Sequence, residues 1–153
     1  MKKVVVAIDG SEVSRGVINY ALHYAAREKD AELFFIHVAE DSEYKKVSFS
    51  NFSVNVPPCD ADVKMEFEKF INEEIKTSGA EKPAKMSVHV ETGSPYGRIV
   101  SFAEEKDADI IMIGHRGLSD LERFFLGSVA SKVVEHAPCS VYVHREKSSA
   151  KKG

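Results

Sequence analysis

The chain has 153 residues, of which 43% are hydrophobic and 29% are charged, and its net charge at pH 7 is −3. This balance predicts one globular domain, residues 1–146, followed by a polar tail at 147–153. It gives no electrostatic reason to expect a nucleic-acid partner, and no apolar run reaches transmembrane length. Because MKKVVVAIDG turns polar at Asp9, we expect no signal peptide. Cys59 and Cys139 form no CxxC motif, so we expect free thiols in a cytoplasmic protein.

Strand-like and helix-like segments alternate along the chain. The first strand, KVVVAI at residues 3–8, has the near-continuous β-branched composition of a strand that is buried on both faces of a parallel sheet. It ends at Asp9-Gly10-Ser11, where Ser11 is the expected N-cap of the first helix. The other expected strands cover 31–38, 85–91, 108–113 and 140–144, and the other helices cover about 62–77, a segment starting at Ser94-Pro95, and about 128–137.

Residues 40–60 show no regular pattern and contain Pro57-Pro58. We interpret them as a long loop, and loops of this length often serve as lids or are partly disordered. Whether its aromatic residues fold over a ligand or contact a partner stays open.

The alternation of elements predicts an α/β fold with an open parallel sheet and right-handed crossovers. In such sheets ligands bind beyond the carboxyl ends of the strands, where the strand order reverses. Asp9 follows the first strand and Gly114 follows the fourth, so the two meet in one pocket if those strands are neighbours. Asp9 could equally be a turn residue that hydrogen-bonds its own backbone.

The glycine-rich stretch Gly114–Val129, GHRGLSDLERFFLGSV, is the strongest functional signal. It follows an apolar strand and leads into a helix. Unpaired N–H groups and the positive end of the helix dipole attract anions at such a place, and glycines let the backbone approach a phosphate. We therefore predict a nucleotide-phosphate site, although the same glycines could form only a tight connection.

These residues resemble the universal stress protein family over nearly the whole chain. Gly114-x2-Gly117-x9-Gly127-Ser128 matches the pattern of the family's nucleotide-binding members, and AIDGSE, Gly93-Ser94-Pro95 and Ala137-Pro138-Cys139-Ser140-Val141 add to the likeness. The resemblance implies a Rossmann-like, adenine nucleotide alpha hydrolase-like fold: a five-stranded parallel sheet in the order 3-2-1-4-5 with helices on both faces. It also implies a homodimer, often formed by the last strands, and ATP with magnesium or manganese as the ligand.

The resemblance also implies roles for particular residues. Ala7 and Asp9 would flank the adenosine, and the backbone of Val38 would contact the adenine. Met112 and Gly114 would lie near the base and ribose. The phosphates would lie against Gly117, Gly127, Ser128 and Val129. The chain departs from the family at Ala7, where many relatives have proline, and at His115-Arg116, where small or polar residues are common. Arg116 could meet phosphate charge or face water, and for His115 we favour solvent exposure.

Several other functions are disfavoured. The chain has no GxxxxGK[ST] motif, no GxGxxG after its first strand, and no Ser-Gly-Gly-x-Asp-Ser loop of the ATP-pyrophosphatase type. We find no placed general base or activated nucleophile. The favoured hypothesis is that the protein is a small ATP-binding regulator in stress response, with an unknown protein partner. The alternatives are a slow ATPase or a phosphotransferase that phosphorylates itself, at Ser119 or Ser128 for example, and a dimeric interaction protein that binds no nucleotide.

Overall fold

A computed structural model of the chain describes residues 1–40, 45–48, 53–56, 60–116 and 126–147. Five parallel strands form the main sheet: β1 (Lys2–Ala7), β2 (Ala31–Ala39), β5 (Met86–Thr92), β6 (Ile110–Gly114) and β7 (Ser140–His144). They lie in the order β5-β2-β1-β6-β7, which is 3-2-1-4-5 when only the strands of this sheet are counted. The predicted fold class and strand order are confirmed.

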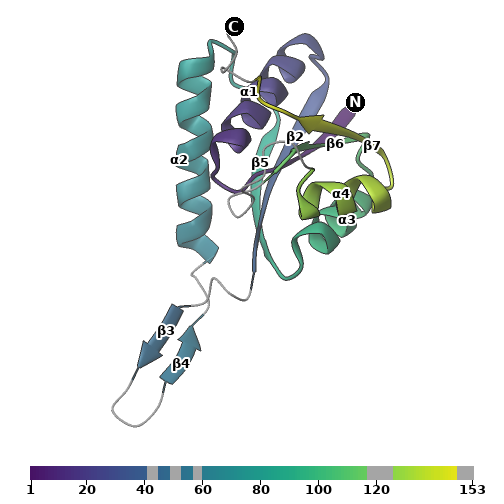
Figure 1. Cartoon of the computed structure of the whole chain (residues 1–153). Coiled ribbons are helices and arrows are strands. Elements are labelled where there is room, and N and C mark those ends of the chain that lie inside the picture. Colours follow the sequence, from purple (N-terminus) through teal and green to yellow (C-terminus); the bar gives the residue numbers. More distant parts are fainter. Residues whose placement is uncertain (41–44, 49–52, 57–59, 117–125, 148–153) are drawn as a thin grey trace, which may run out of the picture.

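Helices cover both faces of this sheet (Figure 1). α1 (Glu12–Arg27) and α2 (Asp60–Ser78) pack on one face, and α3 (Pro95–Lys106) and α4 (Ser128–His136) pack on the other. Within the described ranges, no helix combines the length and apolar character that crossing a bilayer requires.

The β-branched run of β1 serves two separate cores. Val4 and Val6 belong to the core beneath α1 and α2, whereas Val5 and Ala7 belong to the core beneath α3 and α4. Alternate side chains of a strand point to opposite faces, so a strand between two helical layers must be apolar at every position. The sequence KVVVAI therefore places β1 at the centre of the fold.

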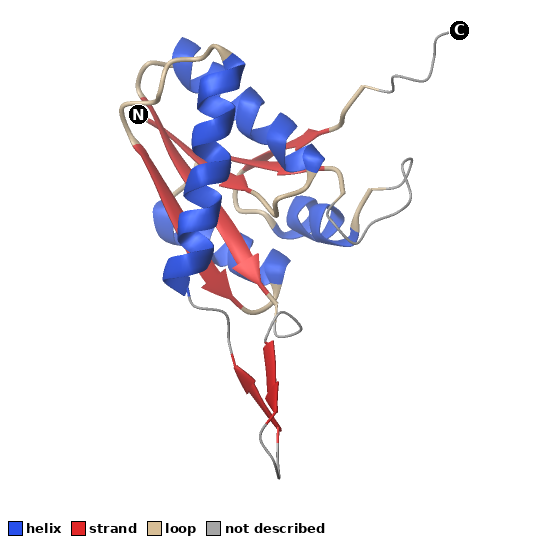
Figure 2. Ribbon diagram, turned by 90° about the vertical axis from the view of Figure 1, so that its left-hand side faces the viewer, coloured by secondary structure: helices blue, strands red, loops and turns tan. Residues whose placement is uncertain are grey.

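Residues 40–60 are not the continuous loop that we predicted. β3 (Lys45–Ser48) and β4 (Ser53–Val56) form an antiparallel hairpin, in which Val47 pairs with Val54. Both views show the hairpin extending away from the main sheet (Figures 1 and 2). The alternating sequence SVNV at 53–56 is typical of a strand, but strands of four residues are close to the shortest that a pattern can identify.

The turn between β1 and α1 is held by hydrogen bonds from its own polar residues. The Ser11 hydroxyl accepts a hydrogen bond from the Ser14 N–H at 3.2 Å, which confirms Ser11 as the N-cap of α1. Ser94 occupies the same position before α3, and Pro95 is the first helical residue as predicted, but the Ser94 hydroxyl makes no capping hydrogen bond. The two serines therefore form a natural comparison.

Ser11→Ala is expected to lower the free energy of unfolding by about 1 kcal/mol, because an N–H at the helix start loses its partner. Ser94→Ala, the matched control, should change the free energy of unfolding by only a few tenths of a kcal/mol, since it removes no capping hydrogen bond. Urea unfolding of both variants beside the parent measures the difference. Equal losses in the two variants would contradict this account of the α1 cap.

Candidate functional site

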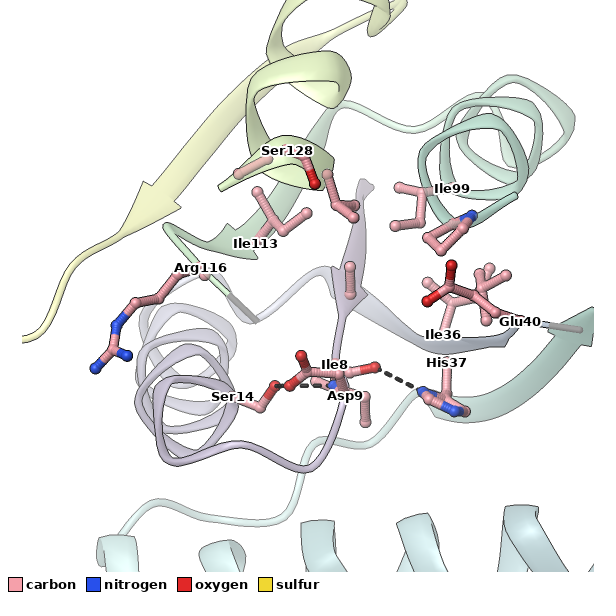
Figure 3. A pocket seen from close by; sticks show the side chains of 16 residues that line it. Ile8, Asp9, Ser14, Ile36, His37, Glu40, Ile99, Ile113, Arg116 and Ser128 are labelled. Atoms are coloured by element: carbon pink, nitrogen blue, oxygen red, sulfur yellow. Dashed lines mark hydrogen bonds between the residues drawn. The ribbon is translucent and has the colours of Figure 1, made fainter. Parts of the chain in front are cut away.

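The carboxyl ends of β1, β2 and β6 surround a cavity of about 220 Å³ (Figure 3). β1 has β2 on one side and β6 on the other, so the strand order reverses here, as it does at the ligand sites of open α/β sheets. The lining residues come from four places. They are β1, the turn after it and the start of α1 (Ala7, Ile8, Asp9, Ser14), β2 and the residue after it (Ile36, His37, Val38, Glu40), α3 (Pro95, Ile99), and β6, the segment after it and the start of α4 (Ile113, Gly114, Arg116, Ser128, Val129, Ala130).

Aliphatic side chains form the floor of the cavity. Ile36, Ile99 and Ile113 are at most 6% exposed, and they come from β2, α3 and β6 respectively. All three belong to the core beneath α3 and α4, so their positions are fixed by packing. A flat apolar group entering the cavity would meet preformed hydrocarbon surface.

Asp9 lies at the centre of the site, on the turn that follows the middle strand. Its Oδ1 accepts hydrogen bonds from the Ser11 N–H at 3.0 Å and from the Ser14 hydroxyl at 2.9 Å. The Ser14 hydroxyl also accepts from the Asp9 N–H at 2.9 Å. Gly10 has a φ of +82°, a value that side-chain-bearing residues rarely adopt. Asp9 therefore has the turn role that the sequence left open, and it also lines the cavity.

The N-terminus of α4 faces the cavity from the β6 side. Gly127 is the N-cap residue, and Ser128, Val129 and Ala130 of the first turn all line the cavity. The first N–H groups of a helix lack intrahelical partners, and the helix dipole adds partial positive charge there. The first turn of α4 contains no acidic residue. This end of the cavity favours an anion.

His115 ties the start of α4 to the edge strand β7. Its N–H donates to the His144 carbonyl at 2.8 Å, and its carbonyl accepts from the Gly127 N–H at 2.6 Å. The residue is only 4% exposed, so our expectation that it faces solvent was wrong. Its partner His144 is affected by burial too: burial is the largest of the effects that lower the pKa of the His144 imidazole below its ordinary value. His115, which we predicted to face solvent from the loop, is therefore part of the protein interior.

The cavity collects many of the residues that the sequence singled out: Ala7, Asp9, Val38, Gly114, Arg116, Ser128 and Val129. The guanidinium of Arg116 points away from the other labelled side chains (Figure 3). Met112 is fully buried in the core beneath α1 and α2, and neither it nor His115 is among the lining residues. Gly117 lies outside the described residues.

Apart from Val38, sequence reasoning missed the residues that β2 and α3 contribute to the cavity wall. His37 is 8% exposed, its Nδ1 lies 3.0 Å from the Ile8 carbonyl oxygen, and its ring stacks on Phe67 with centroids 4.3 Å apart. Glu40 was assigned to the loop, although it follows β2 directly. The available signal was the alternation of Ile36, Val38 and Glu40, which places all three on one face of the strand end.

Comparison with known proteins places the chain in one family. The family model described as "Universal stress protein family" matches residues 1–145. The universal stress protein YxiE of Bacillus subtilis is 35% identical over 148 residues, covering 94% of this chain and 98% of that protein. A universal stress protein of Methanocaldococcus jannaschii is 37% identical over 153 residues, covering 93% of this chain and 81% of that protein.

Solved structures of similar proteins share the fold. The universal stress protein UspA from Lactobacillus plantarum has a TM-score of 0.70 at 24% identity, with 94% of this chain and 97% of that chain covered. A universal stress protein from Archaeoglobus fulgidus, solved in complex with dAMP, has a TM-score of 0.61 at 26% identity, with the same shares covered.

Proposed function

The chain belongs to the universal stress protein family, and from this premise we propose that it binds ATP with Mg²⁺ or Mn²⁺ in the cavity at the ends of β1, β2 and β6. Bound ATP would act as a regulatory signal in a cytoplasmic stress response, in a domain formed by residues 1–146. The observation that carries the proposal is the N-terminus of α4, which opens onto a cavity with an apolar floor.

The phosphates would bind at the start of α4. Ser128 and Val129 line the cavity in the first helical turn, and the dipole of the helix favours negative charge there. Ser128 adds a hydroxyl, whose oxygen points into the cavity in Figure 3. Gly127, whose N–H is bonded to the His115 carbonyl, fixes the direction in which the helix starts.

The nucleoside would lie across the middle of the cavity and toward β2. With the phosphates on the β6 side, the ribose falls near β1 and Asp9, and the base falls near β2 and α3, because β1 lies between β2 and β6. The isoleucines Ile36 and Ile99 supply the apolar surface that a purine ring requires. The Archaeoglobus fulgidus relative bound to dAMP supports an adenine nucleotide as the ligand class.

A divalent cation would arrive with the nucleotide. Among the described residues, no three His, Cys, Asp or Glu side chains are grouped so that they could hold a metal ion. Mg²⁺ in nucleotide sites usually keeps several waters and bonds to the phosphates with only one or two carboxylates. Asp9, which lines the cavity, is the carboxylate we assign to that role.

The regulatory role rests on the connection between the cavity and the sheet edge. β7 is an edge strand, and His115 joins its last residue, His144, to the N-cap of α4 through two main-chain hydrogen bonds. Exposed edge strands pair readily with another chain. We propose that a homodimer forms at β7, and that a nucleotide at α4 alters the surface offered to a protein partner.

Mg-ATP is expected to raise the melting temperature of the nucleotide-free protein. A ligand at a hundred times its dissociation constant stabilises the native state by about 2.7 kcal/mol. For a domain of this size that is a rise of about 5–10 °C. Differential scanning fluorimetry with ATP, ADP and AMP, each with and without Mg²⁺, measures the shift and ranks the nucleotides.

Inorganic triphosphate with Mg²⁺ is the control, because it supplies the anion and the cation without the nucleoside. It should produce a much smaller shift than Mg-ATP. The protein must first be tested for nucleotide retained through purification, since a filled site would not respond. A nucleotide-free protein whose melting temperature is unchanged by any of the nucleotides would refute the proposed function.

A further inference from the structure

Glu40 places a carboxylate at the β2 end of the cavity. It follows β2 directly and lines the cavity together with Ile36 and Val38, the alternate residues of the same strand face. Figure 3 shows its carboxylate on the side of Ile36 and Ile99, across the cavity from Ser128. In the part of the chain that the structure describes, nothing donates a hydrogen bond to this carboxylate or forms an ion pair with it.

The strand order determines which part of a bound nucleotide Glu40 faces. Neighbouring strands are about 4.8 Å apart, so the ends of β2 and β6 are separated by about 10 Å, with β1 between them. The phosphates are drawn to the α4 side by the helix dipole. This step rests on the proposed function: a nucleotide anchored at α4 presents its base, the end farthest from the phosphates, to Glu40.

We propose that the Glu40 carboxylate accepts a hydrogen bond from the 6-amino group of adenine, and so selects adenine over the 6-oxo purines hypoxanthine and guanine. An ionised carboxylate can only accept hydrogen bonds. The 6-amino group of adenine donates, whereas a 6-oxo group accepts and would face the carboxylate with like partial charge. The preference therefore follows from the chemistry of one side chain.

The other polar side chains of the cavity are less suited to this role. Oδ1 of Asp9 already accepts hydrogen bonds from Ser11 and Ser14. Asp9 also lies on the turn after β1, the middle strand, and so nearer the proposed position of the ribose. His37 is bonded through Nδ1 to the Ile8 carbonyl and stacked on Phe67, so its ring is held against α2. Glu40 is exposed at the mouth of the cavity, where an amino group can reach it.

Isothermal titration with ATP and with ITP, which differ at position 6 of the purine, tests the proposal. The parent should bind ATP about tenfold more tightly than ITP. This affinity ratio corresponds to the free energy of one hydrogen bond to a charged group at a partly solvated site. In Glu40→Gln the amide can donate to the 6-oxo group, so the ATP-to-ITP affinity ratio should fall to about one or below. The control Glu104→Gln removes an exposed carboxylate of α3 outside the cavity lining and should keep the parent ratio.

The same titrations distinguish a failure of the Glu40 role from a failure of the proposed function. Equal affinity of the parent for ATP and ITP, or an unchanged ratio in Glu40→Gln that still binds ATP, would overturn the role of Glu40 and leave the proposed function standing. Absence of binding heat with ATP in the nucleotide-free parent would overturn both. The melting temperature of Glu40→Gln without ligand should equal that of the parent, because position 40 is exposed and glutamine has the same shape as glutamate.

Discussion

Ser128→Asp is expected to weaken ATP binding by a hundredfold or more without destabilising the protein. Ser128 is the first residue of α4 and lines the cavity at the end that favours an anion. An aspartate there would face the phosphates at about 5 Å, where two like charges in an effective dielectric of about 20 repel by about 3 kcal/mol. This repulsion corresponds to more than a hundredfold in the dissociation constant.

The unliganded fold should respond in the opposite direction. A negative charge in the first turn of a helix is favourable by about 0.3–1 kcal/mol, because it interacts with the positive end of the dipole. The first turn of α4 contains no acidic residue to repel it. Ser128→Asp should therefore melt at the parent temperature or slightly above it while losing the ATP-dependent shift. This pairing distinguishes a blocked site from a damaged fold.

Ser140→Asp is the matched control for charge. Ser140 is exposed and begins β7, where it pairs with Ile110 at the amino end of β6, whereas the cavity lies at the carboxyl ends of the strands. Its aspartate adds the same charge and should leave the ATP shift unchanged. Titrations in EDTA as well as Mg²⁺ are needed, since the new carboxylate could itself hold the cation. If Ser128→Asp bound ATP with the affinity of the parent under both conditions, the phosphates would not bind at α4.

The sequence predicted the architecture well because its strands are buried between two helical layers. Runs such as KVVVA in β1 and AELFFIHV in β2 have apolar residues on both faces, as expected of strands in a parallel sheet covered by helices on both sides. The hairpin of β3 and β4 was missed for the opposite reason. Its strands have four residues each and lie outside the main sheet, so they are too short to give a clear pattern.

The site was predicted less completely than the fold. The turn after β1 and the start of α4 are marked by glycine, serine and aspartate, whose backbone preferences can be read locally. Glu40 and Ile99 reach the cavity only because β2 and α3 pack beside β1, which no local pattern reveals. His115 shows the reverse error: a polar residue in a glycine-rich stretch was assigned to solvent, yet its main chain joins Gly127 to His144.

Gly114→Ala is expected to lower the free energy of unfolding by about 3 kcal/mol, the upper end of the usual cost of overpacking a buried site. A Cβ on Gly114 would lie 2.5 Å from Cγ1 of Val13 and 3.3 Å from the carbonyl oxygen of Arg116. Val13 is 3% exposed on α1, so it has little room to move. The glycine is needed for the close approach of α1 to the end of β6, whatever its role toward a ligand. Guanidinium unfolding measures the loss.

Gly97→Ala provides the matched control. A Cβ on Gly97 would meet only ordinary van der Waals contacts, the nearest being 3.5 Å from the Ser94 hydroxyl oxygen. Gly97 lies inside α3, where alanine is favoured over glycine by about 0.5–1 kcal/mol. This variant should therefore be as stable as the parent or more stable. A large loss in Gly97→Ala as well would show that glycine replacement in general, and not the contact with Val13, is responsible.

Combining Gly114→Ala with Val13→Ala tests the contact itself. Val13→Ala alone should cost about 2 kcal/mol, because it removes two buried methyl groups. In the double variant the new methyl group at position 114 occupies the space that Val13 vacates. The loss of unfolding free energy in the double variant should therefore be about 2 kcal/mol smaller than the sum of the two single losses. That difference is well beyond the error of additivity for independent sites. Strictly additive losses would mean that the contact with Val13 is not the source of the cost of Gly114→Ala.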